Sequence, residues 1–305
     1  MAETLGSLLV EAAAALSADG FGEPRRHARR LLASALAISQ ADLFGNPDWP
    51  LDERQIGRIR MMLDRMLKRE PLSRILGRRE FWGLDFSLSS ETLDPRPETE
   101  ILVGAVLQRN RDRAAPLRFL DLGTGTGCLL LALLCEFPAA IGIGVDIAAG
   151  AVSTACRNAA RLGFAGRALF FRGNWVEAVS GKFDAIVTNP PYIASGALTL
   201  LPREVACYDP WRALDGGEDG LGAYRALAGA LPALLAPEGI VAAEVGAGQA
   251  DSVTAILKAN GLIFDGIEED LAGLARCVIM RRETGSFPRA VVRGQKKVGM
   301  HRGPV

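Results

Sequence analysis

Apolar residues in the first part of the chain recur at helical spacing. Three stretches show this pattern: "TLGSLLVEAAAAL", "EPRRHARRLLASALA" and "LDERQIGRIRMMLDRMLKRE". In the third stretch, Ile56, Ile59, Leu63, Met66 and Leu67 mark one face. We therefore expect residues 1–72 to form a small all-α domain. We also expect the methionines of the third stretch to lie in its core, namely Met61, Met62 and Met66.

The pattern changes to short, alternating, aromatic stretches over residues 73–97. The run "REFWGLDFSL" places Gly83 between two such stretches, where a turn is expected. This region is predicted to be a β-hairpin linker. Pro95 and Pro97, at the end of this region, stiffen the chain before a helix that is expected to begin near Glu98.

Short strands and helical patterns alternate after residue 116, which is typical of a parallel sheet covered on both faces. The predicted strands are "RFLDLGT", "IGIGVDI", "ALFFRGN", "FDAIVTN" and "GIVAAEVG". The stretches "IFDGIEED" and "ARCVIMRR" follow with a short connection, so the sheet is expected to end in an antiparallel pair. Residues 98–282 are thus predicted to form a Rossmann-like α/β domain. Residues 283–305 are basic and lack periodicity, and we expect a mobile tail.

Charge and composition exclude several classes of protein. The chain has 35 Lys+Arg and 35 Asp+Glu residues, so no overall positive field would draw it to nucleic acid. No apolar run approaches the ~20 residues of a membrane helix, and no leader peptide is visible, so we expect a cytoplasmic protein. The cysteines are odd in number and contain no CxxC pair, which indicates small buried residues rather than disulfides or a metal site. They are Cys128, Cys135, Cys156, Cys207 and Cys277.

The motif "DLGTGTG" joins the first predicted strand of the α/β domain to a helix. Gly123, Gly125 and Gly127 allow a tight turn and a close approach of backbone to a ligand. A dinucleotide fingerprint does not fit, because position six counted from Gly123 is Cys128, and there is no P-loop GK[ST]. The G-x-G-x-G spacing resembles instead the first motif of S-adenosylmethionine-dependent methyltransferases.

Two further strand ends carry residues suited to a nucleoside. Asp146 ends the second strand, 19 residues after Gly127, where an acid reaches ribose hydroxyls in this topology. The same residue would also suit a helix N-cap. Asn174 and Trp175 close the third strand, where an amide and a flat apolar surface suit adenine, although Trp175 could also serve packing alone.

The stretch "TNPPYI" ends the fourth predicted strand. Two consecutive prolines lack backbone N–H groups, so the strand ladder stops there and carbonyl groups are left free. The Asn189 side-chain oxygen and the Pro190 carbonyl oxygen could together accept from an NH₂ group, and Tyr192 could lie against the planar group that carries it. This arrangement suits methyl transfer to a planar nitrogen. The two histidines, His27 and His301, are remote in sequence, so no Ser-His-Asp or Cys-His arrangement is indicated.

From about residue 1 to residue 282 the chain resembles the release factor glutamine methyltransferases. The resemblance rests on "DPRPETEILV", "FLDLGTGTGCLLLAL", "GVDIAAGAV", "GNW", "FDAIVTNPPYI" and "DPWRALDGGEDGLGAYR", in this order. It implies a class I methyltransferase domain that uses S-adenosylmethionine. The implied cofactor-binding residues are Gly123, Thr124, Gly125, Thr126, Gly127, Asp146, Trp175 and Asn189. The implied substrate-binding residues are Asn189, Pro190, Pro191 and Tyr192, with Asn189, Pro190 and Tyr192 in the catalytic role.

The chain departs from the family pattern at two places. Asn174 stands where the family usually has Asp, and its amide can still accept a hydrogen bond. In "PLSRILG", Ser73 and Arg74 replace a polar-aromatic pair.

The expected activity is methylation of the side-chain amide nitrogen (N5) of the glutamine in the Gly-Gly-Gln motif of peptide chain release factors. Three alternatives remain at this point: a ribosomal protein glutamine methyltransferase, a nucleic-acid amino methyltransferase and a non-catalytic S-adenosylmethionine-binding module. The balanced charge argues against a nucleic-acid substrate. We expect a monomer whose partners are release factors and that binds neither membrane nor nucleic acid directly.

Overall fold

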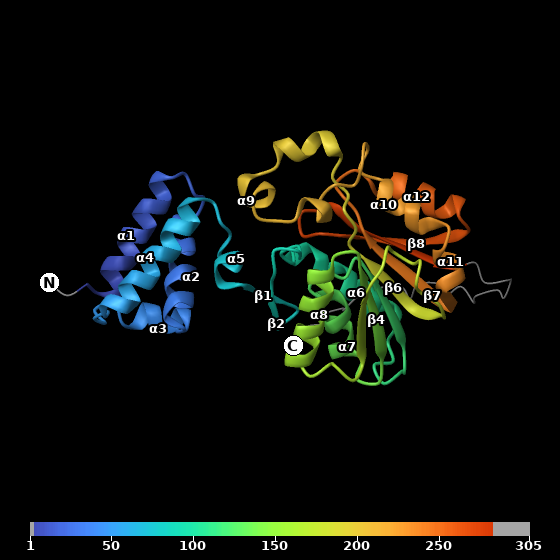
Figure 1. Ribbon diagram of the computed structural model, residues 1–305, viewed down its shortest axis with the longest axis horizontal. Coiled ribbons are helices and arrows are strands. Elements are labelled where there is room, and N and C mark those ends of the chain that lie inside the picture. The colour runs from blue at the N-terminus through green and yellow to red at the C-terminus, as the bar shows by residue number, and fades with distance from the viewer. Residues whose placement is uncertain (1–2, 283–305) are drawn as a thin grey trace, which may run out of the picture.

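The computed structural model describes residues 3–282, and the expected mobile tail lies outside this range. Helices alone form the first part of the described chain, which stands apart from the sheet in Figure 1. They are α1 (Leu5–Ala18), α2 (Pro24–Leu36), α3 (Gln40–Gly45), α4 (Glu53–Leu67) and α5 (Leu72–Leu76). The predicted all-α region is therefore confirmed, and α3 and α5 are short helices that the periodicity did not predict.

The apolar stripe of α4 faces the helical core. Ile59, Leu63 and Met66 are buried there together with Met62. Met61, by contrast, is 57% exposed, so its predicted place in the core was wrong. Each residue turns about 100° around a helix, so Met61, two positions before the buried Leu63, lies on nearly the opposite side of α4.

The predicted hairpin is confirmed as β1 (Arg78–Phe81) and β2 (Leu84–Ser87), which pair in antiparallel fashion. Only Trp82 and Gly83 connect the two strands, and both have positive φ angles of 52° and 70°. Positive φ at both central positions matches the right-handed twist of the flanking strands. The Trp82 Nε1 atom donates to Glu136 Oε1 at 2.8 Å, which attaches the hairpin to the sheet domain.

A seven-stranded sheet with the order β5-β4-β3-β6-β7-β9-β8 forms the second part of the chain. Its strands are β3 (Arg118–Leu122), β4 (Ile141–Asp146), β5 (Ala168–Arg172), β6 (Phe183–Thr188), β7 (Leu235–Glu244), β8 (Leu262–Glu269) and β9 (Ala275–Arg282). The strands from β5 to β7 in this order pair in parallel, and β9 lies antiparallel between β7 and β8. The predicted Rossmann-like sheet with an antiparallel end is thus confirmed.

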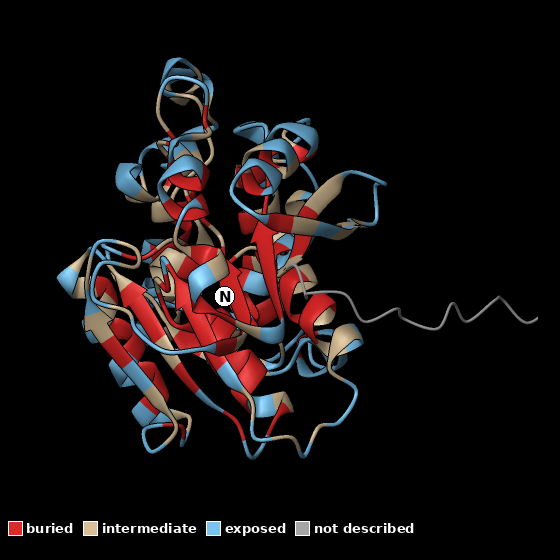
Figure 2. Ribbon diagram, turned by 90° about the vertical axis from the view of Figure 1, so that its right-hand side faces the viewer, coloured by how far each residue is buried: buried red, intermediate tan, exposed pale blue. Residues whose placement is uncertain are grey.

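Helices cover both faces of the sheet (Figure 1). Residues of α6 (Glu100–Arg109), α7 (Cys128–Glu136) and α8 (Ala149–Arg161) share one buried cluster with the sheet. Residues of α10 (Gly222–Ala228), α11 (Leu231–Leu234) and α12 (Ala250–Ala259) share another. Figure 2 shows the buried residues running along the strands, whereas exposed positions lie on the outer sides of the helices.

The cysteines divide between the core and the surface. Cys128 and Cys277 are buried, as expected, but Cys135, Cys156 and Cys207 are exposed, so the prediction was wrong for these three. A small residue in an apolar stretch can lie on either side of a helix, and the stretch alone does not indicate which side.

None of the helices within residues 3–282 combines the length and apolar character that crossing a bilayer requires.

Several shorter elements follow β6 and lie near the end of the sheet where the parallel strands finish. They are 3₁₀ turns over Ser195–Leu200 and Trp211–Ala213, with helix α9 (Arg203–Ala206) between them. A similar turn, Pro97–Thr99, precedes α6. Of these segments, Thr99 and Trp211–Ala213 lie beside the carboxyl ends of the parallel strands, where ligands bind in open parallel sheets.

Candidate active site

A cavity of about 530 Å³ opens at the carboxyl ends of the central strands. The predicted residues that line it are Gly123, Thr124, Gly125, Thr126, Asp146, Trp175, Asn189 and Pro191, together with Asn174. Gly127, Pro190 and Tyr192 do not belong to the lining. The cavity therefore brings together residues from four separate stretches of the sequence.

The glycine motif forms what we call the pocket floor, residues 123–127 with Asp146. Gly123, Gly125 and Gly127 have φ angles of 77°, 54° and 81°, a region that residues with a Cβ atom rarely adopt. Gly127 is the N-cap of α7, so the loop leads directly into the amino-terminal end of this helix. The loop can therefore bring backbone amides close to a ligand in the cavity.

The two threonines of the motif are buried. Thr124 Oγ1 donates to Asp121 Oδ2 at 2.6 Å, and the Thr126 carbonyl oxygen accepts from Asn158 Nδ2 at 2.9 Å. Burial raises the pKa of Asp121 to about 7, although the Thr124 hydroxyl opposes this effect. These contacts attach the loop to β3 on one side and to α8 on the other.

Asp146 connects the floor to the second strand. Its Oδ2 atom accepts from the Gly125 amide at 2.8 Å, and Oδ1 accepts from the Ala148 amide at 2.9 Å. The N-cap of α8 is Ala148 itself, so Asp146 supports the start of this helix from two residues away. Each carboxylate oxygen retains a free lone pair for a hydroxyl group. Burial raises the pKa of Asp146, and the backbone hydrogen bonds oppose the shift.

Trp175 lies over the glycine loop. A Cβ atom placed on Gly123 would be 3.5 Å from Trp175 Cζ3, which places the indole ring in contact with the floor. Trp175 also packs against the core cluster of the α10–α12 face, so it serves both the cavity and the packing. Asn174 donates through Nδ2 to Glu177 Oε1 at 2.7 Å.

Asn189 has a defined orientation. Its Nδ2 atom donates to Thr99 Oγ1 at 3.1 Å, and Thr99 also lines the cavity. Because the amide nitrogen is used in this way, the Oδ1 atom remains available as an acceptor. Thr99 belongs to the "PRPETE" stretch, so this stretch holds the strand-end asparagine from the side of α6.

Behind Asn189 lies a buried carboxyl group that the sequence did not predict. Glu244, the last residue of β7, accepts from the Tyr192 hydroxyl at 3.3 Å. Burial raises the pKa of Glu244 to about 7, and the hydroxyls of Thr99 and Tyr192 and the charge of Arg276 oppose this shift. Burial also raises the pKa of Tyr192, so its hydroxyl group remains a donor. Tyr192 is therefore directed toward Glu244 and not into the cavity.

Glycines of the loop after β6 support the "NPPY" backbone. A Cβ atom on Gly216 would lie 2.8 Å from the Pro191 carbonyl oxygen, and one on Gly220 would lie 2.3 Å from the Tyr192 carbonyl oxygen. Gln249 Nε2 donates to that same Tyr192 oxygen at 2.9 Å. The Gly-Gly pair was a visible signal in the sequence, but no local pattern indicated Gln249.

Two segments outside the sheet edge complete the cavity, and we call them the pocket walls: residues 91–95 and residues 210–213. Glu91, Leu93, Pro95 and the whole stretch Pro210–Ala213 line the cavity. Neither segment was predicted as part of the site. Neither belongs to any strand of the described chain, so no strand ladder holds either segment in place.

Two family models match the chain. One is the PrmC N-terminal domain, over residues 7–77, and the other is the methyltransferase small domain, over residues 88–203. The first covers the helical region, and the second covers the floor and the "NPPY" stretch.

Curated relatives match over most of their length. The release factor glutamine methyltransferase of Rhodospirillum rubrum is 49% identical over 93% of this chain and 87% of the relative. That of Agrobacterium fabrum is 43% identical over 92% of this chain and 98% of the relative. Among solved structures, the catalytic domain of hMettl16 superposes with a TM-score of 0.54 at 14% identity, over 69% of this chain and 80% of that chain, and this likeness concerns the fold alone. The chain belongs to the release factor glutamine methyltransferase family.

Proposed function

We propose that this chain methylates the side-chain amide nitrogen of the glutamine in the Gly-Gly-Gln motif of peptide chain release factors, with S-adenosylmethionine as methyl donor. The observation that carries the proposal is the orientation of Asn189. Its Nδ2 atom is engaged by Thr99, which leaves Oδ1 as an acceptor in the cavity. An acceptor at this place suits an incoming NH₂ group and not a carbonyl group.

The floor suits S-adenosylmethionine, which supplies an electrophilic methyl group on its sulfonium. The left-handed glycines allow the backbone to approach a ligand closely, and Asp146 has lone pairs left for ribose hydroxyls. Trp175 offers a flat apolar surface for a base. The cavity of about 530 Å³ lies within the usual range for ligands of this size.

Asn189 and Pro190 are proposed to hold the glutamine amide. Asn189 Oδ1 and the Pro190 carbonyl oxygen accept its two hydrogens, which leaves the nitrogen lone pair directed at the methyl group. Pro191 lines the cavity beside them. Tyr192 supports this stretch from outside the cavity, because its hydroxyl group donates to Glu244. The methylated nitrogen is acidic enough to lose its extra proton to water, so the reaction needs no dedicated base.

The helical region is proposed to recognise the release factor. We assign residues 1–72 to substrate recognition, residues 73–97 to the linker and residues 98–282 to methyl transfer. The curated relatives carry the release factor name over nearly the same span, which supports a shared substrate. A folded protein surface also fits a chain without excess positive charge better than a phosphate backbone does.

The test is incubation of the purified protein with labelled S-adenosylmethionine and a purified release factor. Mass spectrometry should show a single added methyl group on the glutamine of the Gly-Gly-Gln motif. A release factor in which this glutamine is replaced by alanine is the matched control and should take no label. Label on a ribosomal protein, on DNA or on RNA, with the release factor unmodified, would contradict the proposed substrate.

A further inference from the structure

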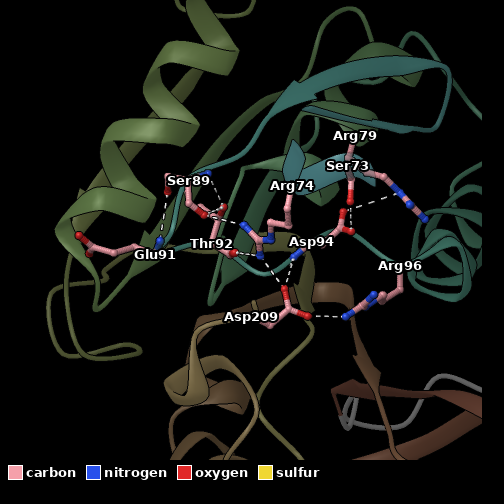
Figure 3. A network of polar contacts seen from close by, with 9 residues as sticks. All are labelled: Ser73, Arg74, Arg79, Ser89, Glu91, Thr92, Asp94, Arg96 and Asp209. Carbon is pink, nitrogen blue, oxygen red and sulfur yellow. Dashed lines mark hydrogen bonds and ion pairs between the residues drawn. The ribbon is translucent and has the colours of Figure 1, made fainter. Parts of the chain in front are cut away.

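The two pocket walls meet at one buried carboxylate. The Asp209 side chain is only 2% exposed, and it immediately precedes the wall of residues 210–213. It accepts from Arg74 Nη2 at 2.5 Å, from Arg96 Nη2 and from the Asp94 amide at 3.2 Å. Figure 3 shows these donors converging on Asp209. Asp94 and Arg96 flank Pro95 in the other wall, so Asp209 connects the two walls directly.

Arg74 makes this connection rigid. Its guanidinium group is 8% exposed and also donates to the carbonyl oxygens of Ser89 and Thr92, at 2.7 and 2.6 Å. One planar group thus fixes three points of the chain at once, which the single ammonium group of a lysine cannot reproduce. Glu91 attaches the same wall to α8, since its Oε2 atom accepts from the Gly150 amide at 3.0 Å.

A second buried pair supports the same wall. The Asp94 carboxylate accepts from the Ser73 hydroxyl, and Arg79 Nε lies 3.8 Å from Asp94 Oδ1 (Figure 3). Ser73 and Arg74 make up one of the two places at which the sequence departs from the family pattern, the other being Asn174. Both Ser73 and Arg74 take part in this network. The departure therefore coincides with the contacts that hold the walls.

The wall that begins after Asp209 continues directly to the proposed reacting residues. Leu214 accepts through its carbonyl oxygen from the Ile193 amide at 3.0 Å, and the Gly216 amide donates to the Ile193 carbonyl oxygen at 2.8 Å. Gly216 also lies close against the Pro191 backbone. A shift of Asp209 is therefore transmitted to the "NPPY" stretch through backbone contacts.

We propose that Asp209 is a positioning residue for methyl transfer: held by Arg74 and Arg96, it sets the distance between the pocket walls and so the alignment of the glutamine with the methyl donor. Only the kinetic consequence of this inference depends on the proposed function. Asp209 does not line the cavity. Its effect falls on the orientation of the reacting groups, where a displacement of about 1 Å can lower a rate by about 100-fold.

The kinetic test uses Asp209→Asn and Arg96→Gln, each assayed for transfer to a release factor. Asp209→Asn should lower kcat by about 30- to 100-fold, while KM for the release factor and the Kd of S-adenosylmethionine change less than about threefold. Arg96→Gln keeps the Arg74–Asp209 pair and should lower kcat by about tenfold. Asp209→Glu, which restores the charge, should recover most of the rate. If Asp209→Asn does not fold, Arg96→Gln decides the outcome.

Asp219→Asn is the matched control. It removes an Asp–Arg pair of the same loop, Asp219 with Arg225 at 2.5 Å, in which both side chains are about half exposed. Its kcat should stay within about twofold of the unmodified protein. A folded Asp209→Asn or Arg96→Gln protein with unchanged kcat would overturn the proposal. A loss of cofactor affinity equal to the loss in rate would also overturn it, because the pocket would then be loosened as a whole.

Hydrogen exchange tests the connection without any substrate. In Arg96→Gln, peptides covering residues 89–96 and 210–213 should lose protection together, whereas the floor peptide 121–127 should not change. Faster exchange in only one of the two walls would overturn the proposal. Failure of the unmodified protein to methylate a release factor would contradict the proposed function. The exchange experiment would still decide whether Asp209 connects the two walls.

Discussion

The pocket floor and the pocket walls form the same cavity by different means. In the floor, the glycine backbone adopts a left-handed conformation, and its main contacts run to the neighbouring strand and to Asp146. In the walls, the chain is irregular, and Arg74, Arg96 and Asp209 hold it through charged side chains. The floor therefore depends on local geometry, whereas the walls depend on a few side chains from distant parts of the sequence.

This difference predicts different responses to substitution. A change in the floor should act first on cofactor affinity, because the proposed contacts exist before the reaction begins. A change at the walls, or where they meet the floor, should act first on turnover, because it misaligns groups that must meet in the transition state. The following substitutions test this division.

The largest effect is expected at Asn189, which follows β6 and donates to Thr99 of the "PRPETE" stretch. Asn189→Ala removes the proposed acceptor for the glutamine amide and should lower turnover by about 30- to 1,000-fold, corresponding to about 2–4 kcal/mol. Cofactor affinity, measured by calorimetry, should change much less. Asn260→Ala, which removes an exposed amide at the end of α12, is the control and should leave turnover unchanged. Near-normal turnover of Asn189→Ala would mean that "NPPY" is only a turn.

The next effect concerns Glu244 and the dependence of stability on pH. The folded state keeps the Glu244 proton up to about pH 7, whereas an unfolded glutamate loses its proton near its ordinary pKa of about 4.3. Between these values the unfolded state binds fewer protons, so the free energy of unfolding decreases as pH rises. The decrease from this residue is up to about 4 kcal/mol and is complete above pH 7.

Glu244→Gln should remove this contribution. Urea unfolding at pH 5 and pH 8 should therefore show a smaller loss of stability with rising pH than the unmodified protein shows. Asp121, which has a similarly raised pKa, contributes equally to both proteins and cancels in the comparison. Glu218→Gln, at an exposed position, is the control for loss of a surface charge. An identical pH dependence in Glu244→Gln and the unmodified protein would contradict the raised pKa.

Asp146 tests the floor itself. Asp146→Ala should weaken S-adenosylmethionine binding by about 10- to 100-fold, since a hydrogen bond between a hydroxyl and a charged group contributes about 1.5–3 kcal/mol. Calorimetry with S-adenosylmethionine measures the effect, and Asp112→Ala serves as a control outside the cavity. Unchanged affinity would show that Asp146 does not bind the cofactor and serves only to hold the Gly125 and Ala148 amides.

The smallest effect is expected where α9 meets the helical region. Glu204 of α9 lies 3.5 Å from Arg69, and both side chains are partly exposed (Figure 1 shows α9 facing the helices). Glu204→Gln should raise KM for the release factor by less than about fivefold, because such pairs contribute less than about 1 kcal/mol. Added salt should abolish the difference. A more than tenfold increase would contradict the small contribution expected of this partly exposed pair.

The same division explains what the sequence could predict. The floor and "NPPY" are contiguous motifs at strand ends, so their residues could be recognised together, and periodicity was sufficient for the sheet and for most helices. Glu244, Gln249 and Asp209 could not be found in this way, because their partners are remote in sequence and no local pattern specifies a pair. The predictions for Met61 and for the exposed cysteines were wrong for a related reason: an apolar stretch does not specify which side of a helix faces the core.

The bond between Arg74 and Asp209 joins residues that are 135 positions apart. Contacts of such separation require the intervening chain to be largely ordered before they form, because closing a long disordered loop costs entropy. The floor, by contrast, forms within the short continuous stretch that runs from β3 through α7 to β4. A refolding chain should therefore protect residues 121–127 before residues 210–213, as pulse-labelled hydrogen exchange would show. The floor of the cavity is therefore expected to form early in folding. Its walls are expected to form only after Arg74 and Asp209 have come together.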